Sequence, residues 1–352
     1  MTLCIDAHEN RDVAVFDVPG AYLNTYMPDD NFLLIKFNDK FVDIMCDVNL
    51  ELVEDVRMEN GRKILYLRIV KALYGCIESV LLRYNLFLDK STKLGFKVNK
   101  YDRCVANKMI NGKQCTIVWY VDDVKVSHVD ATVVSHIITY MQKEFGNLTI
   151  TRGKKHQYLG MDIEFCKNNK VAISMFKHIN EALEMVSGGV EGATTIPAKK
   201  NLFDVDCESQ LLDEDWGDNF HSVVAKLLWK AKKGRPDLDL SISFLCTRVA
   251  TPNIDDWQKL ERVLTYLSYT KHERRFIDIN NISVMNTYID ASYAVYPNMR
   301  GHTGCAISFR HGIVHNKALK QNINVKSSTE CELVGLSEYV PYSLWLEYFF
   351  EE

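Results

Sequence analysis

The chain has 352 residues, of which 47% are hydrophobic and 25% charged, and its formal net charge is −4. This length exceeds one ordinary domain, so we expect two or three domains with substantial cores. The content of 17 Gly and 7 Pro excludes a collagen-like, low-complexity or wholly disordered chain. No apolar run approaches the roughly 18 residues of a membrane span, and the start lacks a signal-peptide pattern. We therefore expect neither membrane insertion nor secretion by a signal peptide.

Charge and cysteine usage narrow the class further. The ten cysteines form no C-x-x-C pair, so free thiols in a reducing compartment are expected. A net charge of −4 argues against an obvious nucleic-acid binder, but its distribution weakens that argument. Residues 1–60 hold 4 Lys and Arg against 13 Asp and Glu, whereas residues 61–352 hold 38 against 33. The acidic excess thus belongs to the N-terminal part.

The first third of the chain predicts strands followed by a helix. Runs rich in β-branched and aromatic residues predict strands at 13–19, 32–37 and 64–70, and residues 79–93 have a helical pattern. Two further β-rich runs, 115–121 and 124–127, are separated by Asp122 and Asp123, a pattern typical of a hairpin with two carboxylates at its tip.

The middle of the chain predicts a capped helix, a strand pair and a linker. Asp130 is a good N-cap for apolar residues spaced three and four apart, and Gly146 is a good end for that helix. A strand pair is expected at 158–165 and 170–174. Residues 187–192, Ser-Gly-Gly-Val-Glu-Gly, are the best linker candidate, so we place a domain boundary there.

Two helices are expected next, at 221–233 and 255–270, with a basic run at 226–235. That run suits phosphate contacts along a nucleic acid, but a charged run is equally typical of a solvated face. Trp229 and Trp257 are expected to fill cores rather than to stack on bases.

The final block predicts a small sheet and a helix. Strands are expected at 285–290, 303–309 and 312–315, and a helix from about Ser328 that Pro341 would kink.

Three carboxylates form the candidate catalytic set. Asp122 and Asp123 lie at the expected hairpin tip, and Asp17 lies in the first strand. Two-metal phosphoryl transfer needs carboxylate oxygens from several rigid elements, with the ions about 4 Å apart. The alternative interpretation is ordinary turn chemistry at Asp122–Asp123 and a strand-end residue at Asp17. Spacing alone leaves both open.

Five motifs occur in an order and spacing that resemble the reverse transcriptase of copia-type long-terminal-repeat retrotransposons. They are Asp17-Val-Pro-Gly-Ala-Tyr22, Lys71-Ala-Leu-Tyr-Gly75, Tyr120-Val-Asp-Asp123, Tyr158-Leu-Gly160 and Arg235-Pro-Asp237. The last block resembles the RNase H domain that follows in the same polyprotein, through Tyr288-Ile-Asp290, His302-Thr-Gly304 and Ser327-Ser-Thr-Glu-Cys-Glu332.

The resemblance implies an α+β fold of the right-hand polymerase type followed by a truncated RNase H-like domain. Residues 1–186 would form the palm and partial fingers. Residues 187–280 would form the thumb and connection region, and residues 281–352 the RNase H-like domain, which lacks its C-terminal part.

The resemblance also implies roles for individual residues. Asp17, Asp122 and Asp123 would hold two Mg²⁺ or Mn²⁺ ions, with Asp123 in a supporting place. Tyr22 would pack under the incoming sugar and exclude a 2′-hydroxyl, so deoxynucleotides would be preferred. Tyr74 and Gly75 would lie close to nucleotide and template, although a plain turn before a helix is an equal alternative. Residues 158–160 would grip the primer end, or would merely pack in a turn.

For the RNase H-like block the resemblance implies Asp290 and Glu332 as metal ligands. Glu330 lies two residues earlier on a helix and points elsewhere. The family's further acids come later than Glu352, where this chain ends, so no RNase H activity is expected.

Departures from the family pattern bear on catalysis. Sixteen residues precede Asp17, fewer than the family's basic fingers segment, which would weaken nucleotide binding. Glu78 and Arg83 stand where related sequences place Gln and Trp, and they add charge beside a packed helix face. Two hypotheses follow: an RNA-directed DNA polymerase acting on dNTPs and a primed RNA or DNA template, or an inactive remnant that at most binds nucleic acid. Either would be intracellular, in cytoplasm or nucleus.

Overall fold

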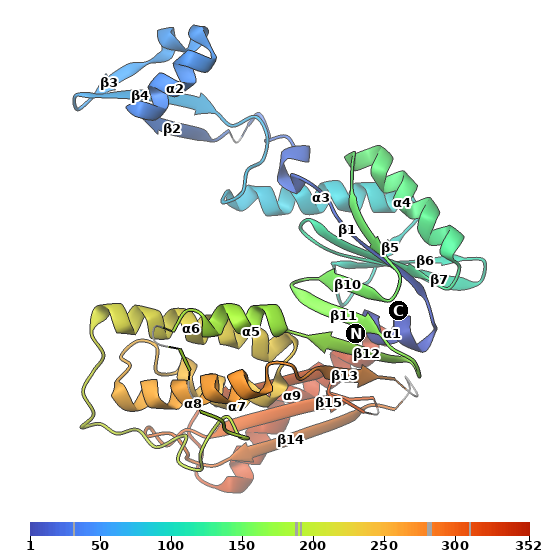
Figure 1. Ribbon diagram of the computed structural model, residues 1–352. Helices are drawn as coiled ribbons and strands as arrows, with labels where there is room; N and C mark the ends of the chain where they lie inside the picture. Colours follow the sequence, from blue (N-terminus) through green and yellow to red (C-terminus); the bar gives the residue numbers. More distant parts are fainter. Residues whose placement is uncertain (31, 187–188, 191, 280–283, 310) are drawn as a thin grey trace.

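The structure is a computed structural model that describes residues 1–30, 32–186, 189–190, 192–279, 284–309 and 311–352 (Figure 1). The strands of the described residues form four sheets, of six, four, three and three strands. No helix in these ranges is both long enough and apolar enough to cross a membrane. Positions 187, 188 and 191 of the expected linker lie outside the described residues, as do positions 280–283.

The largest sheet has six antiparallel strands and carries the candidate carboxylates. Its strand order is β5-β6-β7-β8-β1-β9, and β1 pairs with β8 on one side and β9 on the other. The four inner residues of β1 are buried, which agrees with the unbroken apolar run at its sequence. The bounds are β1 Asp12–Asp17, β5 Lys97–Val98, β6 Val105–Ile110, β7 Lys113–Tyr120, β8 Asp123–His128 and β9 Thr149–Arg152.

Two helices, α3 (Ile77–Lys93) and α4 (Ala131–Phe145), cover one face of this sheet. Their apolar stripes meet Phe16 of β1 and Trp119 of β7 in one buried cluster. The Asp130 side chain accepts a hydrogen bond from the Thr132 backbone N–H at 2.8 Å, which confirms the predicted N-cap.

The opposite face of the six-stranded sheet is covered by the N-terminal helix α1 (Thr2–His8). Cys4 and Ala7 pack there against Val13 and Val15 of β1. The sequence did not predict this helix, which has only 7 residues and begins at the chain start. Because α1 covers this face, side chains on both sides of β1 are removed from water.

A small unit that lies between β1 and α3 in the sequence stands apart from the rest of the molecule (Figure 1). It contains β2 (Leu34–Asn38), β3 (Arg57–Glu59) and β4 (Arg62–Arg68) in the order β2-β4-β3, with α2 (Lys40–Val48) and the short helix η2 (Leu50–Asp55). Several apolar side chains of this unit are exposed, among them Phe41, Val48 and Leu50.

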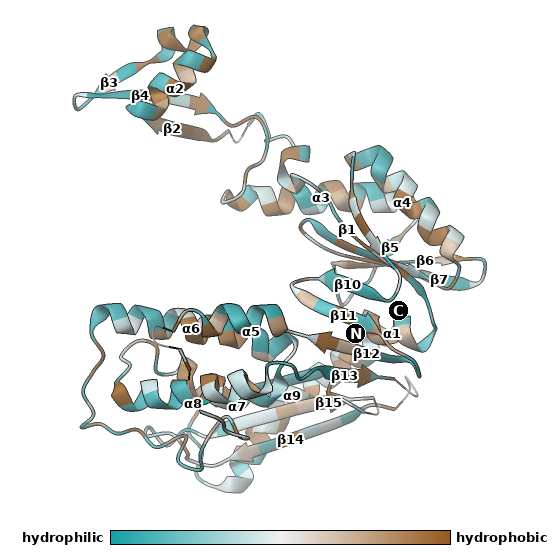
Figure 2. Ribbon diagram, viewed as in Figure 1, coloured by the Kyte–Doolittle hydropathy of each residue, from teal (hydrophilic) through white to brown (hydrophobic). Residues whose placement is uncertain are grey.

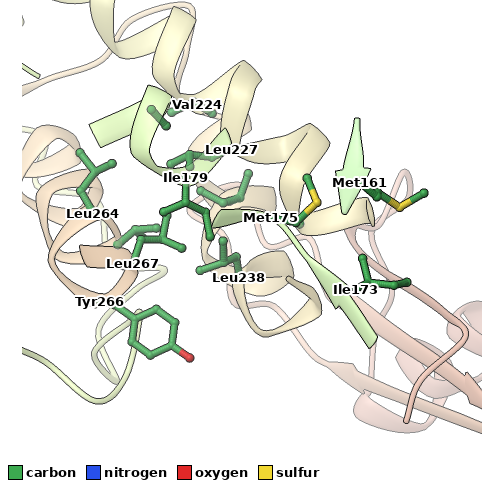
Figure 3. Close-up of a cluster of buried hydrophobic side chains, with 14 of the residues drawn as sticks. Met161, Ile173, Met175, Ile179, Val224, Leu227, Leu238, Leu264, Tyr266 and Leu267 are labelled. Atoms are coloured by element: carbon green, nitrogen blue, oxygen red, sulfur yellow. The ribbon is translucent and has the colours of Figure 1, made fainter. Parts of the chain in front are cut away.

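A second layer combines a four-stranded sheet with four helices. The sheet order is β10-β11-β12-β13, so β12 pairs with a strand about a hundred residues later in the sequence. Apolar side chains of this sheet and of its helices form a continuous core (Figure 3). The outer surfaces of α5 and α6 are hydrophilic (Figure 2). The bounds are β10 Lys155–Tyr158, β11 Met161–Phe165, β12 Lys170–Ser174, β13 Arg275–Asp278, α5 Phe176–Leu183, α6 Glu214–Lys233, η3 Pro236–Leu238, α7 Asp239–Cys246 and α8 Ile254–Thr270.

The basic run at 226–235 is not one continuous solvated face, because Lys230 and Arg235 are each only 3% exposed. Arg235 is held by Asp237 at 2.7 Å and by the Thr270 hydroxyl at 2.7 Å. Trp257 is buried as predicted. The prediction for Trp229 was wrong, because that side chain is 39% exposed at the surface of α6.

The last sheet has the order β14-β15-β16 and is covered by α9 (Ser328–Glu351). The third strand was predicted at 312–315, whereas β16 begins only at His315. The bounds are β14 Asn286–Ser292, β15 His302–Ser308 and β16 His315–Lys320. Pro341 lies inside one continuous helix and does not divide it. The end of α9 reaches the large sheet, where the Trp345 indole N–H donates to the Tyr101 carbonyl at 2.8 Å.

Gly312 is the point at which the last sheet region meets β13 most closely. Its φ is +75°, and an added Cβ would lie 1.8 Å from the Phe276 carbonyl oxygen. We expect Gly312→Ala to lower the free energy of unfolding by more than about 2 kcal/mol, because backbone strain and overlap add. Urea denaturation would measure it, with Gly112→Ala as control. Gly112 has φ +73° and no atom within 4 Å, so equal losses in both variants would contradict a steric role.

Candidate active site

The pairing of β1 with β8 brings Asp17 beside Asp123. Asp17 ends β1, Asp123 begins β8, and the two residues are direct partners in the antiparallel register. Tyr120 pairs with Asp123, so only Val121 and Asp122 form the loop between β7 and β8. Carboxylates that are more than a hundred positions apart in the sequence therefore lie at one end of the sheet.

The loop that carries Asp122 has a strained backbone. Val121 has φ +56°, a left-handed conformation that a β-branched residue rarely adopts. Short hairpin loops favour positive φ because it matches the strand twist, and Gly or Asn usually provides it. The backbone N–H of Val18 donates to the Asp122 carbonyl at 3.0 Å, which ties the loop to the end of β1. Such strain persists only where the surroundings hold it, and it is common at functional sites.

Burial and the neighbouring carboxylates shift the pKa values of two of the acids. Partial burial, and then the charge of Asp122, raises the pKa of Asp17. Burial raises the pKa of Asp123 as well, followed by the charges of Asp122 and Asp17, while a backbone hydrogen bond from Leu159 acts in the opposite direction. None of the three forms a salt bridge with a Lys, Arg or His among the described residues. The cluster therefore concentrates negative charge, and Arg83 is a nearby cation that interacts with Asp122 electrostatically without a salt bridge.

Two tyrosines form a wall beside the acids. The Tyr22 ring is 6% exposed and meets the Tyr74 ring edge-on, with centroids 4.5 Å apart. The Tyr74 hydroxyl donates to Asp122 Oδ2 at 3.3 Å. Burial, and then the Asp122 charge, raises the pKa of Tyr74, so the hydroxyl stays protonated and able to donate. Gly75 follows with φ +94°, just before α3 begins at Ile77.

The β10–β11 hairpin approaches the site from the second layer. Leu159 and Gly160 form its two-residue loop with φ +48° and +68°, the pattern of a type I′ turn. An added Cβ on Gly160 would lie 2.8 Å from the ring of Trp229. Helix α6 thus supports this hairpin, and the Leu159 backbone reaches Asp123. Gripping of a primer end by residues 158–160 stays a prediction.

The donor types at this site suit a divalent cation. Mg²⁺ prefers carboxylate oxygens, and Asp17, Asp122 and Asp123 offer them on two strand ends and one loop. In the described ranges, however, no group of three or more His, Cys, Asp and Glu side chains gathers closely enough to hold an ion. The residues fit a cation chemically, and their side chains would have to converge to bind one.

Asp290 and Glu332 are close in the last sheet region. Asp290 is exposed on β14, and Glu332 Oε1 accepts a hydrogen bond from the backbone N–H of Ala291 at 3.3 Å. Glu330 instead accepts from the Lys326 backbone N–H at 2.7 Å, ahead of the first turn of α9. Asp290 also borders a groove of about 960 Å³ between η3, α7 and the sheet. Metal binding by this pair stays a prediction.

Sequence reasoning missed one residue next to the site. Arg83 of α3 donates from Nε to the carbonyl of Val121 at 3.1 Å. The sequence had shown it only as a charge on a packed helix face. Because the contact involves a backbone carbonyl in a loop 38 positions later, no local pattern predicts it.

Comparison with known proteins finds transposon proteins among the relatives of this chain, and no family model matches the chain. A putative transposon Ty5-1 protein of Saccharomyces cerevisiae is 24% identical over 277 residues, covering 76% of this chain and 86% of that protein. The truncated transposon Ty1-A Gag-Pol polyprotein is 22% identical over 343 residues, and the transposon Ty1-LR2 Gag-Pol polyprotein 21%. Both alignments cover 92% of this chain, which spans only 28% and 19% of the two polyproteins. These similarities support a retroelement-derived protein related to long-terminal-repeat retrotransposon polyproteins.

Proposed function

We propose that this chain is the RNA-directed DNA polymerase region of a copia-type retrotransposon. One observation carries the proposal: β1 and the β7–β8 hairpin bring Asp17, Asp122 and Asp123 to one sheet end, beside the Tyr22–Tyr74 pair. Three acids flanked by an aromatic wall suit nucleotidyl transfer onto a primer 3′-hydroxyl. Similarity to transposon Gag-Pol polyproteins supports the same assignment.

In this proposal the side chains mainly bind and position. Asp17 and Asp122 would be the principal cation ligands, and Asp123 would support them from the start of β8. Two bound Mg²⁺ or Mn²⁺ ions would activate the attacking hydroxyl and stabilise the departing pyrophosphate. The buried Tyr22 ring would limit the space beneath the nucleotide sugar, and the exposed Tyr74 would contact the base or template.

Primer extension tests this function. The purified chain would be given an RNA template, an annealed DNA primer, dNTPs and Mg²⁺ or Mn²⁺, beside the Asp122→Asn/Asp123→Asn double variant. We expect extension by the natural chain and none by the variant, because asparagine keeps the shape but removes the ligand charge. A DNA template in parallel would show whether RNA is required. A folded natural chain without extension would reject the polymerase proposal.

An inactive remnant is the second candidate, and one observation favours it. No three-ligand metal group is already assembled within the described residues. A remnant that kept nucleic-acid affinity would bind an RNA–DNA hybrid, with affinity that falls as salt rises, yet show no extension with either cation. If the chain neither binds the hybrid nor extends the primer, both the polymerase and the nucleic-acid-binding remnant are rejected.

Replacement of Tyr22 by alanine is expected to relax the choice of sugar. Removing the ring opens space next to the nucleotide site, so ribonucleotide incorporation relative to deoxynucleotide should rise on the order of 100-fold. Tyr22→Phe keeps the ring and serves as the matched control. Single-nucleotide incorporation kinetics would measure the ratio. An unchanged ratio in the alanine variant would show that Tyr22 does not face the sugar.

A further inference from the structure

Arg83 is a buried cation that forms no salt bridge among the described residues, although the charge of Asp122 acts on it. It lies in the middle of the buried stripe of α3 and is only 1% exposed. Its guanidinium carbon lies 5.2 Å from the centroid of the Phe87 ring and 4.8 Å from that of Phe145. Within the described chain, neither Nη1 nor Nη2 has a hydrogen-bond partner, and no acid forms a salt bridge with it. Burial of an unpaired charge is costly, so the position requires an explanation.

Among the described residues, the one side-chain hydrogen bond of Arg83 is to the loop that carries Asp122. Nε donates to the Val121 carbonyl at 3.1 Å, and the next carbonyl, of Asp122, accepts from Val18 at 3.0 Å. Two successive carbonyls of the loop thus accept hydrogen bonds from two different segments, α3 and the residue that follows β1. Val121 is also the residue with φ +56°. The contact therefore fixes the backbone at the point where it is strained.

We propose that Arg83 is a positioning residue of this site. Its Nε–H holds the Val121 carbonyl and keeps the loop in the left-handed conformation that presents Asp122 to Asp17 and Tyr74. The two phenylalanine rings keep the guanidinium in place, because cation–π contact and burial restrict its rotamers. The importance of this role for catalysis rests on the proposed polymerase function. The hold on the loop does not depend on that function.

Three substitutions separate the hydrogen bond from the charge. In Arg83→Gln the amide nitrogen occupies the same place along the side chain as Nε, so it keeps the donor and loses the charge. Arg83→Lys keeps the charge but has a methylene at that place. Arg83→Met has neither a donor nor a charge and has a similar length. All three are unbranched at Cβ and suit a helix.

Hydrogen–deuterium exchange of residues 119–124 is the first readout, because it requires no activity. We expect exchange in Arg83→Gln to stay within about threefold of the natural chain, and exchange in the Lys and Met variants to rise about tenfold, the effect of losing one hydrogen bond. Mn²⁺ affinity from the electron paramagnetic resonance signal should follow the same order. Extension rates are compared last.

Two results would overturn the positioning role of Arg83. One is an equal exchange rate of residues 119–124 in all three variants, and the other is an exchange rate in Arg83→Met that equals that of the natural chain. If Arg83→Met does not fold, the contrast between Gln and Lys still decides, because each retains a polar head group. If the natural chain extends no primer, the polymerase proposal fails while the exchange results still test Arg83.

Discussion

Asp123→Asn is expected to abolish primer extension and at the same time to stabilise the fold. Loss of a carboxylate from the cluster should lower the extension rate by 10³-fold or more, on the order of the effect of removing one preorganised charge-stabilising group. Burial and the charges of Asp122 and Asp17 raise the pKa of Asp123, so its ionised form is disfavoured in the folded chain. Neutralisation should raise the free energy of unfolding by about 0.5 kcal/mol, a modest value because the site is partly solvated.

The pH dependence follows from the direction of these shifts. Asp17 and Asp123 have folded-state pKa values above the ordinary 3.8, so the folded chain holds more protons than the unfolded chain above that pH. The contribution of these two groups to the free energy of unfolding should therefore fall as pH rises from about 3.8 through their folded-state pKa values.

Urea titrations at several pH values would measure the difference between Asp123→Asn and the natural chain. That difference should be smallest below pH 3.8 and largest at neutral pH. Glu54→Gln, at an exposed position outside the cluster, is the matched control and should show no such trend. A stability difference that grows as pH falls would show that burial and the neighbouring charges do not raise the pKa of Asp123.

Lys125→Met is expected to have the largest effect on stability. Lys125 of β8 and Asp6 of α1 form an ion pair in which both side chains are 0% exposed. Removing the cation leaves a buried carboxylate, which typically costs 3–5 kcal/mol. Arg11 remains 3.9 Å from Asp6, so we expect the lower end, about 3 kcal/mol.

The double variant Asp6→Leu/Lys125→Met tests the reason for that loss. Replacing both charges by apolar groups leaves no uncompensated charge, so its stability should lie within about 1 kcal/mol of the natural chain. Arg11 keeps its contacts with Glu9 at 2.7 Å and Thr116 at 2.9 Å. Lys36→Met, in an exposed pair with Glu59, should leave the free energy of unfolding nearly unchanged. A double variant as unstable as Lys125→Met would show that packing, rather than charge, decides.

Local sequence patterns determined many elements of the fold and the candidate acids. The predicted strand at 13–19 became β1, and the predicted hairpin around Asp122 became β7 and β8. The Asp130 cap and its helix were correct to within a residue. These features depend on residue preferences and periodicities that act over a few positions, and short strands around an Asp-Asp tip have few other solutions.

Tertiary structure alone decided which face of a strand meets water. Lys125 alternates with Val124 and Val126, so its sequence suggests an outward side chain, yet it is fully buried because α1 covers that face. The contact of Arg83 with the distant Val121 carbonyl likewise depends on tertiary structure. The same is true of Trp229, whose ring packs on Gly160 of the distant β10–β11 hairpin and remains 39% exposed. The sequence by itself determined the elements and the identity of the acids. Their register, their shared end of the sheet and the buried cations around them depend on contacts between distant segments, which no local pattern encodes.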